Sequence, residues 1–161
     1  MDVLIGTFLV GIGATAMTDL WAVLRKRLFG VAPADFGLVG RWLAHMTRGR
    51  FRHDSIAAAS RVHGERAIGW IAHYLIGISF AAVLIGISGV EWLEQPSLGP
   101  AAAVGIGTVV APYFVMQPAM GAGFAASCTP RPAAARLHSL VTHAIFGLGL
   151  FAAGWLLDAM G

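Results

Sequence analysis

Charged residues are scarce in this sequence. Asp, Glu, Lys and Arg make up only 12% of the 161 residues, whereas 57% are hydrophobic and the mean hydropathy is +0.73. Soluble domains carry about a quarter of their residues as charges. The composition therefore argues against an ordinary soluble domain and predicts a protein embedded in lipid.

Cysteine and catalytic motifs are nearly absent as well. Cys128 is the only cysteine, which excludes an intrachain disulfide. The chain has no G-x-S-x-G motif and no phosphate-binding P-loop, and "GIGATA" lies in an apolar run without the strand that dinucleotide binding needs. The sequence thus leaves open whether the protein is an enzyme, and it favours a role without catalysis.

Long apolar runs are what the sequence does contain. A membrane-spanning helix needs roughly 20 mostly apolar residues, and four runs qualify: 3–24, 67–90, 98–120 and 137–157. They predict an all-α polytopic membrane protein that forms a single integral domain over residues 1–161. Pro112 and Pro118 should kink the third run, because proline donates no backbone hydrogen bond.

Basic residues occur in only two of the connections between the runs. All 11 lie in 25–66 or between the third and fourth runs: Arg25, Lys26, Arg27, Arg41, Arg48, Arg50, Arg52, Arg61, Arg66, Arg131 and Arg136. The other connection and the chain ends carry acidic residues instead. Because basic loops stay cytoplasmic, the pattern predicts that both termini face outside. The net charge of +3 thus reflects topology and contact with anionic headgroups, without a nucleic-acid partner.

The loop 25–66 is expected to contain short helices. The stretch 37–51 alternates apolar and polar residues at helical spacing, which is typical of an interfacial helix, and Asp54 or Ser55 could cap a second helix through 56–65. Four polar loop residues are expected to be solvated or to face headgroups, with a cytoplasmic vestibule or a second metal site as the alternative: His45, His53, His63 and Glu65.

The second and fourth runs share a pattern. Aligning His73 with His143 also brings Gly77 onto Gly147, and the "GIG" that begins at Gly11 recurs later in the third run. This repeat predicts two parallel helical hairpins. Small residues at four-residue spacing mark close helix contacts, so both histidines should point into the bundle.

Ionisable residues within the runs fall at one depth. At about 1.5 Å rise per residue, Asp19 lies roughly 9 Å inside the cytoplasmic boundary, and His73 and His143 lie roughly 10 Å inside. Met116 and Gln117 lie at similar depth. Ionisable groups at such depth are costly unless paired, so they form a functional hypothesis by default.

Three interpretations of this layer remain open. The leading one is binding or translocation of a small solute, proton or metal ion, by a protein that would have to form a homodimer. The second is a redox subunit that carries haem b between His73 and His143, with Arg66 and Arg136 at the propionates or at headgroups, or a transition metal on the same histidines and Asp19. The third is a scaffold in which Asp19 pairs with a histidine.

Several phrases carry a family resemblance: "GATAMTDLW", "GRWLAHMTRGRFRHDSI", "GWIAHYLIGISFA", "PYFVMQPAMGAGFAAS" and "LHSLVTHAIFGLGLF". Together they resemble a bacterial membrane family known only as domain of unknown function 2938. The resemblance spans nearly the whole chain. It implies a compact inner-membrane protein with four spans, and it implies no activity.

Overall fold

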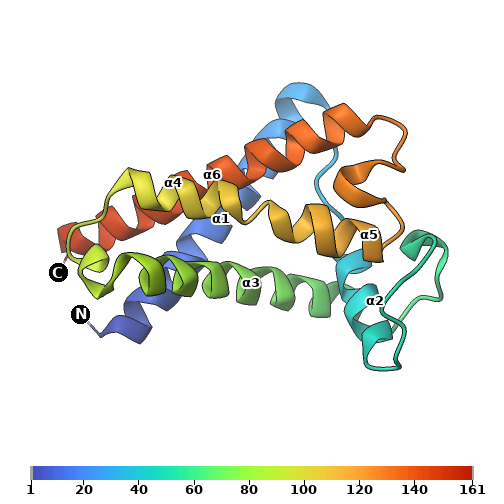
Figure 1. Cartoon of the computed structure of the whole chain (residues 1–161), viewed down its shortest axis with the longest axis horizontal. Helices are drawn as coiled ribbons and strands as arrows, with labels where there is room; N and C mark the ends of the chain where they lie inside the picture. Colours follow the sequence, from blue (N-terminus) through green and yellow to red (C-terminus); the bar gives the residue numbers. More distant parts are fainter. Residues whose placement is uncertain (1, 161) are drawn as a thin grey trace. The chain divides into compact units, whose positions relative to one another are not determined.

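The structure is a computed structural model that describes residues 2–160, and this part of the chain is all-helical, with 76% helix and no strand (Figure 1). The α-helices are α1 (Val3–Phe29), α2 (Phe36–Met46), α3 (Glu65–Ser88), α4 (Leu98–Gly107), α5 (Gln117–Ala119) and α6 (Pro132–Met160). Short 3-10 turns are η1 (Ile56–Ala58), η2 (Val90–Leu93) and η4 (Phe124–Ala126), and η3 (Pro112–Met116) is a π-helical turn.

Four segments are long and apolar enough to cross a membrane: Val3–Phe29, Glu65–Ser88, Leu98–Ala119 and Pro132–Met160. Their outer surfaces are apolar too, since Leu4, Leu20 and Ile87 are 80%, 69% and 74% exposed. Exposure of such apolar surfaces is unfavourable in water and favourable in contact with lipid tails. The prediction of an all-α protein with four membrane-spanning helices is confirmed.

The helix ends differ from the predicted ones for local reasons. The Asp2 carboxylate caps α1 by accepting hydrogen bonds from the amides of Leu4 and Ile5, and Gly30 ends the helix in the left-handed region at φ 65°. The helix therefore extends five residues past its predicted end at 24. Lys26 and Arg27 in the last turn favour this extension, because their positive charges interact favourably with the negative end of the helix dipole.

The third span is interrupted, as its prolines predict. The α-helix α4 ends at Gly107, and a π-turn follows from Pro112 to Met116. Pro112 and Pro118 lack the N–H groups that would continue an α-helical ladder there. A kink was predicted; the structure has a change of helix type.

The chain divides into two compact units. Within the described residues, unit 1 comprises 2–33, 74–108 and 140–160, and unit 2 comprises 34–73 and 109–139. The helices α3 and α6 contribute residues to both units. The prediction of a single integral domain stays a prediction.

Glycines set the helix crossings in unit 1. A Cβ at Gly11 would overlap the Ile78 backbone, and one at Gly77 would overlap the Thr15 hydroxyl, so α1 and α3 touch here. In the same way, a Cβ at Gly105 would overlap the Gly147 backbone where α4 meets α6. These are the glycines that the repeat aligned. Two helical hairpins with matching contacts thus form unit 1.

The two hairpins of unit 1 meet along α1 and α6. A Cβ at Gly149 would lie 2.8 Å from the Ala14 Cα, and one at Gly13 would lie 2.8 Å from the Ala153 Cβ. Around these contacts, Val10, Ala14 and Leu150 are fully buried. Phe80 and Phe146 pack edge to face beside them, with ring centroids 6.1 Å apart.

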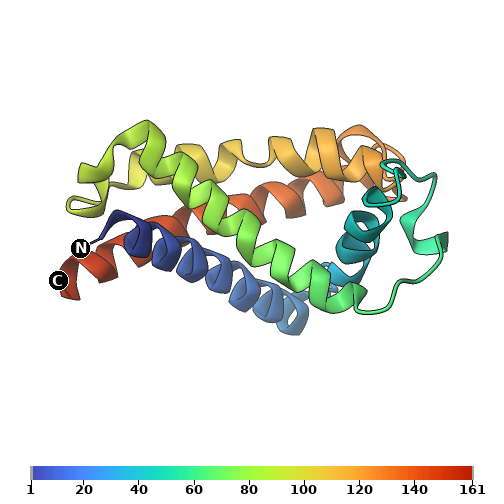
Figure 2. The same cartoon turned by 90° about the horizontal axis from the view of Figure 1, so that it is seen from below.

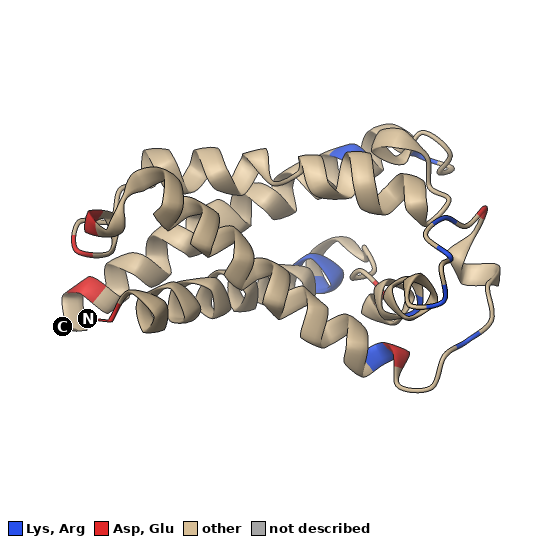
Figure 3. Ribbon diagram, turned by 60° about the horizontal axis from the view of Figure 1, so that its bottom comes forward, with Lys and Arg blue, Asp and Glu red and all other residues tan. Residues whose placement is uncertain are grey.

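The two ends of unit 1 carry opposite charge. Residues 2 and 160 and the connection from α3 to α4 lie at one end (Figures 1 and 2). The acidic residues at that end, drawn red in Figure 3, are Asp2, Glu91, Glu94 and Asp158. The opposite end of α1 carries Arg25, Lys26 and Arg27. This separation matches the charge pattern of the sequence.

A buried arginine organises unit 2. Arg41 on α2 forms an ion pair with Glu65 at 2.8 Å, and its Nη1 also donates to the carbonyls of Ile56, Ala57 and Ala59 at 3.1 to 3.2 Å. These carbonyls point at the guanidinium, and only the Ile56 carbonyl also accepts a helical hydrogen bond, from the Ala59 amide in η1. The predicted second helix over 56–65 is therefore wrong, and only the turn η1 forms.

The buried face of α2 is also not the predicted one. Arg41 and His45 are 5% and 4% exposed, and His53 in the loop is 6% exposed. The expectation that His45 and His53 are solvated or face headgroups is therefore wrong. Gly40 permits this packing, because a Cβ there would overlap the Glu65 carbonyl at the start of α3.

Candidate functional site

Asp19 is the only acidic residue within α1, and it meets α3 in unit 1. The Tyr74 hydroxyl donates a hydrogen bond of 2.9 Å to Asp19 Oδ2. The nearby threonines are satisfied inside their own helix, since the hydroxyls of Thr15 and Thr18 donate to the carbonyls of Gly11 and Thr15. The carboxylate and the phenol thus form a polar contact between α1 and α3.

His143 meets α4 in the other hairpin of unit 1. Its Nδ1 lies 2.9 Å from the Thr108 hydroxyl, which also donates to the Gly105 carbonyl at 2.6 Å. A hydroxyl has one hydrogen to donate, so His143 Nδ1 donates to the Thr108 oxygen. In the neutral ring Nε2 is then the basic nitrogen, able to accept a proton.

These two pairs lie at similar depth along unit 1. The closest approach of α1 to α6, at Ala14 and Gly149, serves as the common reference. At about 1.5 Å rise per residue, Asp19 lies about 7.5 Å beyond it and His143 about 9 Å beyond it, both away from the end that holds residues 2 and 160. Carboxylate, phenol, hydroxyl and imidazole thus form one polar layer across unit 1.

The other predicted site residues belong to unit 2. The His73 ring stacks on Phe36, the first residue of α2, with centroids 4.1 Å apart. Gln117 Nε2 lies 3.5 Å from the Ser139 hydroxyl, at the limit of a hydrogen bond, and Gln117 Oε1 is buried without a partner among residues 2–160. Met116 is partly buried at the end of the π-turn.

The two arginines that were considered for propionates have different surroundings. Arg66 is exposed at the start of α3. Arg136 is exposed too, but its Nε donates at 2.8 Å to the carbonyl of Ala125, a residue held at φ 46°. Within residues 2–160, no three His, Cys, Asp or Glu side chains are grouped to hold a metal ion.

Tyr74 and Thr108, the hydroxyl partners of Asp19 and His143, were not predicted from the sequence. Depth along the helix was the available signal for Tyr74, which follows His73 directly in the second run. The rotation of each helix about its axis decides which side chains meet, and that depends on the glycine crossings.

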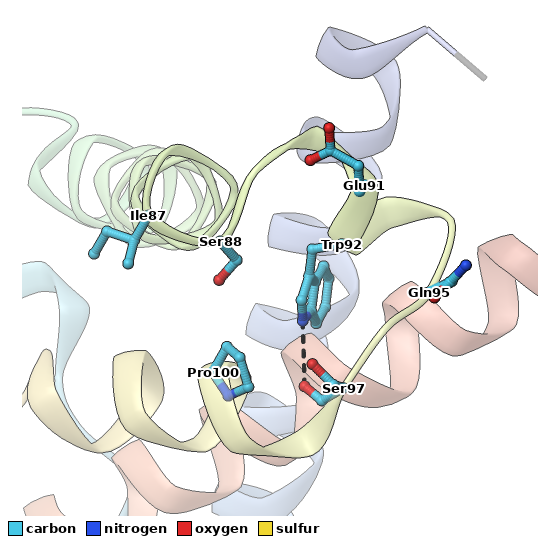
Figure 4. Close-up of a pocket in the computed structure, with 7 residues that line it drawn as sticks. All are labelled: Ile87, Ser88, Glu91, Trp92, Gln95, Ser97 and Pro100. Atoms are coloured by element: carbon cyan, nitrogen blue, oxygen red, sulfur yellow. Dashed lines mark hydrogen bonds between the residues drawn. The ribbon is translucent and has the colours of Figure 1, made fainter.

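A separate pocket opens at the acidic end of unit 1 (Figure 4). Its volume is about 520 Å³, and it is lined by Ile87, Ser88, Glu91, Trp92, Gln95, Ser97 and Pro100. The Trp92 indole N–H donates to the Ser97 carbonyl at 3.2 Å, which ties η2 to the start of α4. The pocket is an open depression and contains none of the predicted site residues.

The fold and the polar layer together define a multi-pass membrane protein. The model of the family described as "Protein of unknown function (DUF2938)" matches residues 8–157, so the chain belongs to this family. The resemblance found in the sequence is thereby confirmed. No curated protein and no solved structure matches the chain.

Proposed function

We propose that this protein binds and translocates protons, alone or together with a small solute, through the polar layer of unit 1. Asp19 and His143 are the groups that exchange protons, and Tyr74 and Thr108 orient them. The observation that carries the proposal is the pairing of both ionisable groups, at one depth, with hydroxyls on neighbouring helices.

The physical cost of these residues supports a function. Ionisable side chains inside a membrane are unfavourable by several kcal/mol unless they are paired, and they commonly form proton relays. A hydroxyl partner keeps the acid or base oriented without fixing its charge, since it both donates and accepts. The participation of His73, Met116 and Gln117 stays a prediction.

The proposal also assigns the orientation of the chain across the membrane and the membrane in which it lies. The basic loop residues would face the cytoplasm and both chain ends the outside of a bacterial inner membrane, as the positive-inside rule requires. Exposed loop arginines, among them Arg48, Arg50 and Arg66, would contact anionic headgroups. A homodimer is the expected assembly, because four spans are few for a transport path.

Proton flux into proteoliposomes tests the proposal. The full chain is reconstituted with a pH-sensitive dye inside the vesicles, and a potassium gradient with valinomycin drives protons. We expect wild-type flux above that of empty vesicles, at least a tenfold loss in Asp19→Asn and a comparable loss in His143→Gln. Asparagine keeps the acceptor for Tyr74, so the fold should survive.

Glu94→Gln is the matched control, because it removes a carboxylate outside the spans and should leave flux unchanged. Wild-type flux equal to that of empty vesicles would overturn the proposal. So would full flux in Asp19→Asn.

Nothing in the geometry favours the haem or metal interpretation, and a spectrum separates it from the proposal. We expect the purified protein to show no Soret band and no stoichiometric metal. A Soret band that disappears in His73→Ala and His143→Ala would instead select a haem protein.

A further inference from the structure

Two buried histidines are in direct contact in unit 2. His45 Nδ1 and His53 Nε2 lie 2.8 Å apart, and His45 Nε2 lies 3.1 Å from the Ser60 carbonyl oxygen. The side chains are 4% and 6% exposed. The fourth ring nitrogen, His53 Nδ1, is buried without a hydrogen-bond partner among residues 2–160.

The hydrogen-bond partners fix where the protons lie. A carbonyl oxygen only accepts, so His45 Nε2 carries a hydrogen. The contact between the two rings needs one more hydrogen, shared along the line from Nδ1 to Nε2. These two hydrogens make both rings neutral. A third hydrogen, which gives the pair its positive charge, can only reside on His53 Nδ1.

The surroundings of His53 disfavour this third hydrogen. Burial lowers the pKa of His53 most, and the neighbouring His45 and Arg50 lower it further. Asp54 and the Ala119 carbonyl act in the opposite direction but do not compensate. The turn η1 and the helix α5 bring no titratable residue to the ring. His53 is therefore neutral at pH 7.

The same segment joins the loop to the end of the third span. The backbone amides of His53 and Ile56 donate to the carbonyls of Ala119 and Met120 at 2.9 and 3.1 Å. A Cβ at Gly121 would overlap the Asp54 carbonyl, so the loop lies directly on this turn. These two hydrogen bonds are the docking contacts of the loop.

We propose that the His45–His53 pair is a one-proton site whose filling releases the loop 50–56 from Ala119 and Met120. An added proton lies on a buried nitrogen that has no hydrogen-bond partner among residues 2–160. The Ala119 carbonyl offsets only part of the cost of burial and of the neighbouring His45 and Arg50. The proton reaches the pair through a pocket of about 260 Å³ lined in part by Arg50, His53 and Ser55. The inference does not depend on the proposed proton flux.

The direction in which pH changes the docking of the loop follows from thermodynamic linkage between proton binding and docking. A released loop exposes the His53 ring, whose pKa returns to about 6.5 in water. Because the docked state has the lower pKa, docking is fully stable above pH 6.5 and weakens as the pH falls toward the docked value. In that window the open fraction rises up to tenfold per pH unit for one proton.

Hydrogen–deuterium exchange of the full chain in detergent micelles tests the proposal. We expect protection of the His53 and Ile56 amides, corrected for the intrinsic pH dependence of exchange, to fall between pH 7 and pH 5, while amides of α2 stay protected. In His53→Gln the side-chain amide donates to His45 but takes no proton, so protection should not change with pH. His63→Gln, at an exposed position, should behave as the wild type.

Imidazole ¹⁵N NMR of the wild type keeps the test decisive if His53→Gln does not fold. We expect two neutral rings at pH 7, both with hydrogen on Nε2, and a single-proton titration below 6.5. A pair already charged at pH 7, two independent titrations near 6.5, or unchanged protection down to pH 5 would each overturn the proposal.

Discussion

The two units satisfy their buried polar groups in different ways. In unit 1 the helices bond their own backbone, so the interhelical polar contacts join side chains, Tyr74 with Asp19 and Thr108 with His143. In unit 2 the polar contacts join a side chain to backbone, because Arg41 donates to the loop carbonyls of Ile56, Ala57 and Ala59. A span requires helices that approach closely, whereas a buried loop requires donors brought from elsewhere.

The ionisable residues of the two units also have different partners. Arg41 is held charged, because hydrogen bonds to Glu65 raise its pKa above the usual value. Asp19 and His143 each contact a hydroxyl, a group that can both donate and accept a hydrogen bond. The proton exchange that we propose for unit 1 would use these contacts, whereas the charge of Arg41 stabilises a loop.

Removing Arg41 should have the largest effect on this comparison. Arg41→Ala removes the donor of the Ala57 and Ala59 carbonyls, one donor from the Ile56 carbonyl and two from the Glu65 carboxylate. A buried acceptor left without a donor costs about 1–3 kcal/mol. We expect a lower thermal unfolding midpoint in detergent and rapid trypsin cleavage within residues 48–61.

Arg48→Ala is the control, because Arg48 is exposed and its loss should change stability by less than about 0.5 kcal/mol. Equal stability of the two variants would show that the loop does not depend on the guanidinium.

A single methyl group at a helix crossing of unit 1 should have the next largest effect. A Cβ at Gly105 would overlap the Gly147 backbone, while a Cβ at Gly107 meets nothing within 4 Å. We expect Gly105→Ala to destabilise the protein by about 1–3 kcal/mol. Gly107→Ala should be neutral, or stabilising by up to about 1 kcal/mol through helix propensity.

Chemical unfolding of both variants in mixed micelles measures this difference. If Gly107→Ala is as harmful as Gly105→Ala, the crossing is not where the repeat places it.

The sequence predicts unit 1 well because its constraints are visible in residue types. Lipid demands long apolar runs, and close helix approach demands small residues such as Gly77 and Gly147. Depth along the helix then located Asp19 and His143. The hydroxyl partners were not predicted, since no residue pattern reports the rotation of a helix within a bundle that is apolar on nearly every side.

Unit 2 was predicted less well for the opposite reason. Arg41 is bonded largely to backbone carbonyls, which every residue has, so the sequence carries no sign of them. Polar residues at helical spacing on α2 were therefore interpreted as a water-facing side. In the structure this side is buried, because the loop after it supplies the acceptors.

A pair of tryptophans gives the smallest and finest test of the comparison. The Trp42 indole N–H in unit 2 donates to the Phe51 carbonyl at 2.9 Å, whereas the Trp21 N–H in unit 1 is buried without a partner among residues 2–160. Both changes to Phe remove the same atoms, so their difference isolates the hydrogen bond. We expect Trp42→Phe to be about 0.5–1 kcal/mol more destabilising than Trp21→Phe.

The hydrogen bond from Trp42 to Phe51 is exposed, so water can replace the lost donor, and we expect a difference in unfolding free energy near the lower end of this range. Unfolding midpoints measured in one detergent give the difference directly. A larger loss from Trp21→Phe would mean that the indole in unit 1 has a polar partner, and that unit 1, like unit 2, relies on donors to groups outside its own helices.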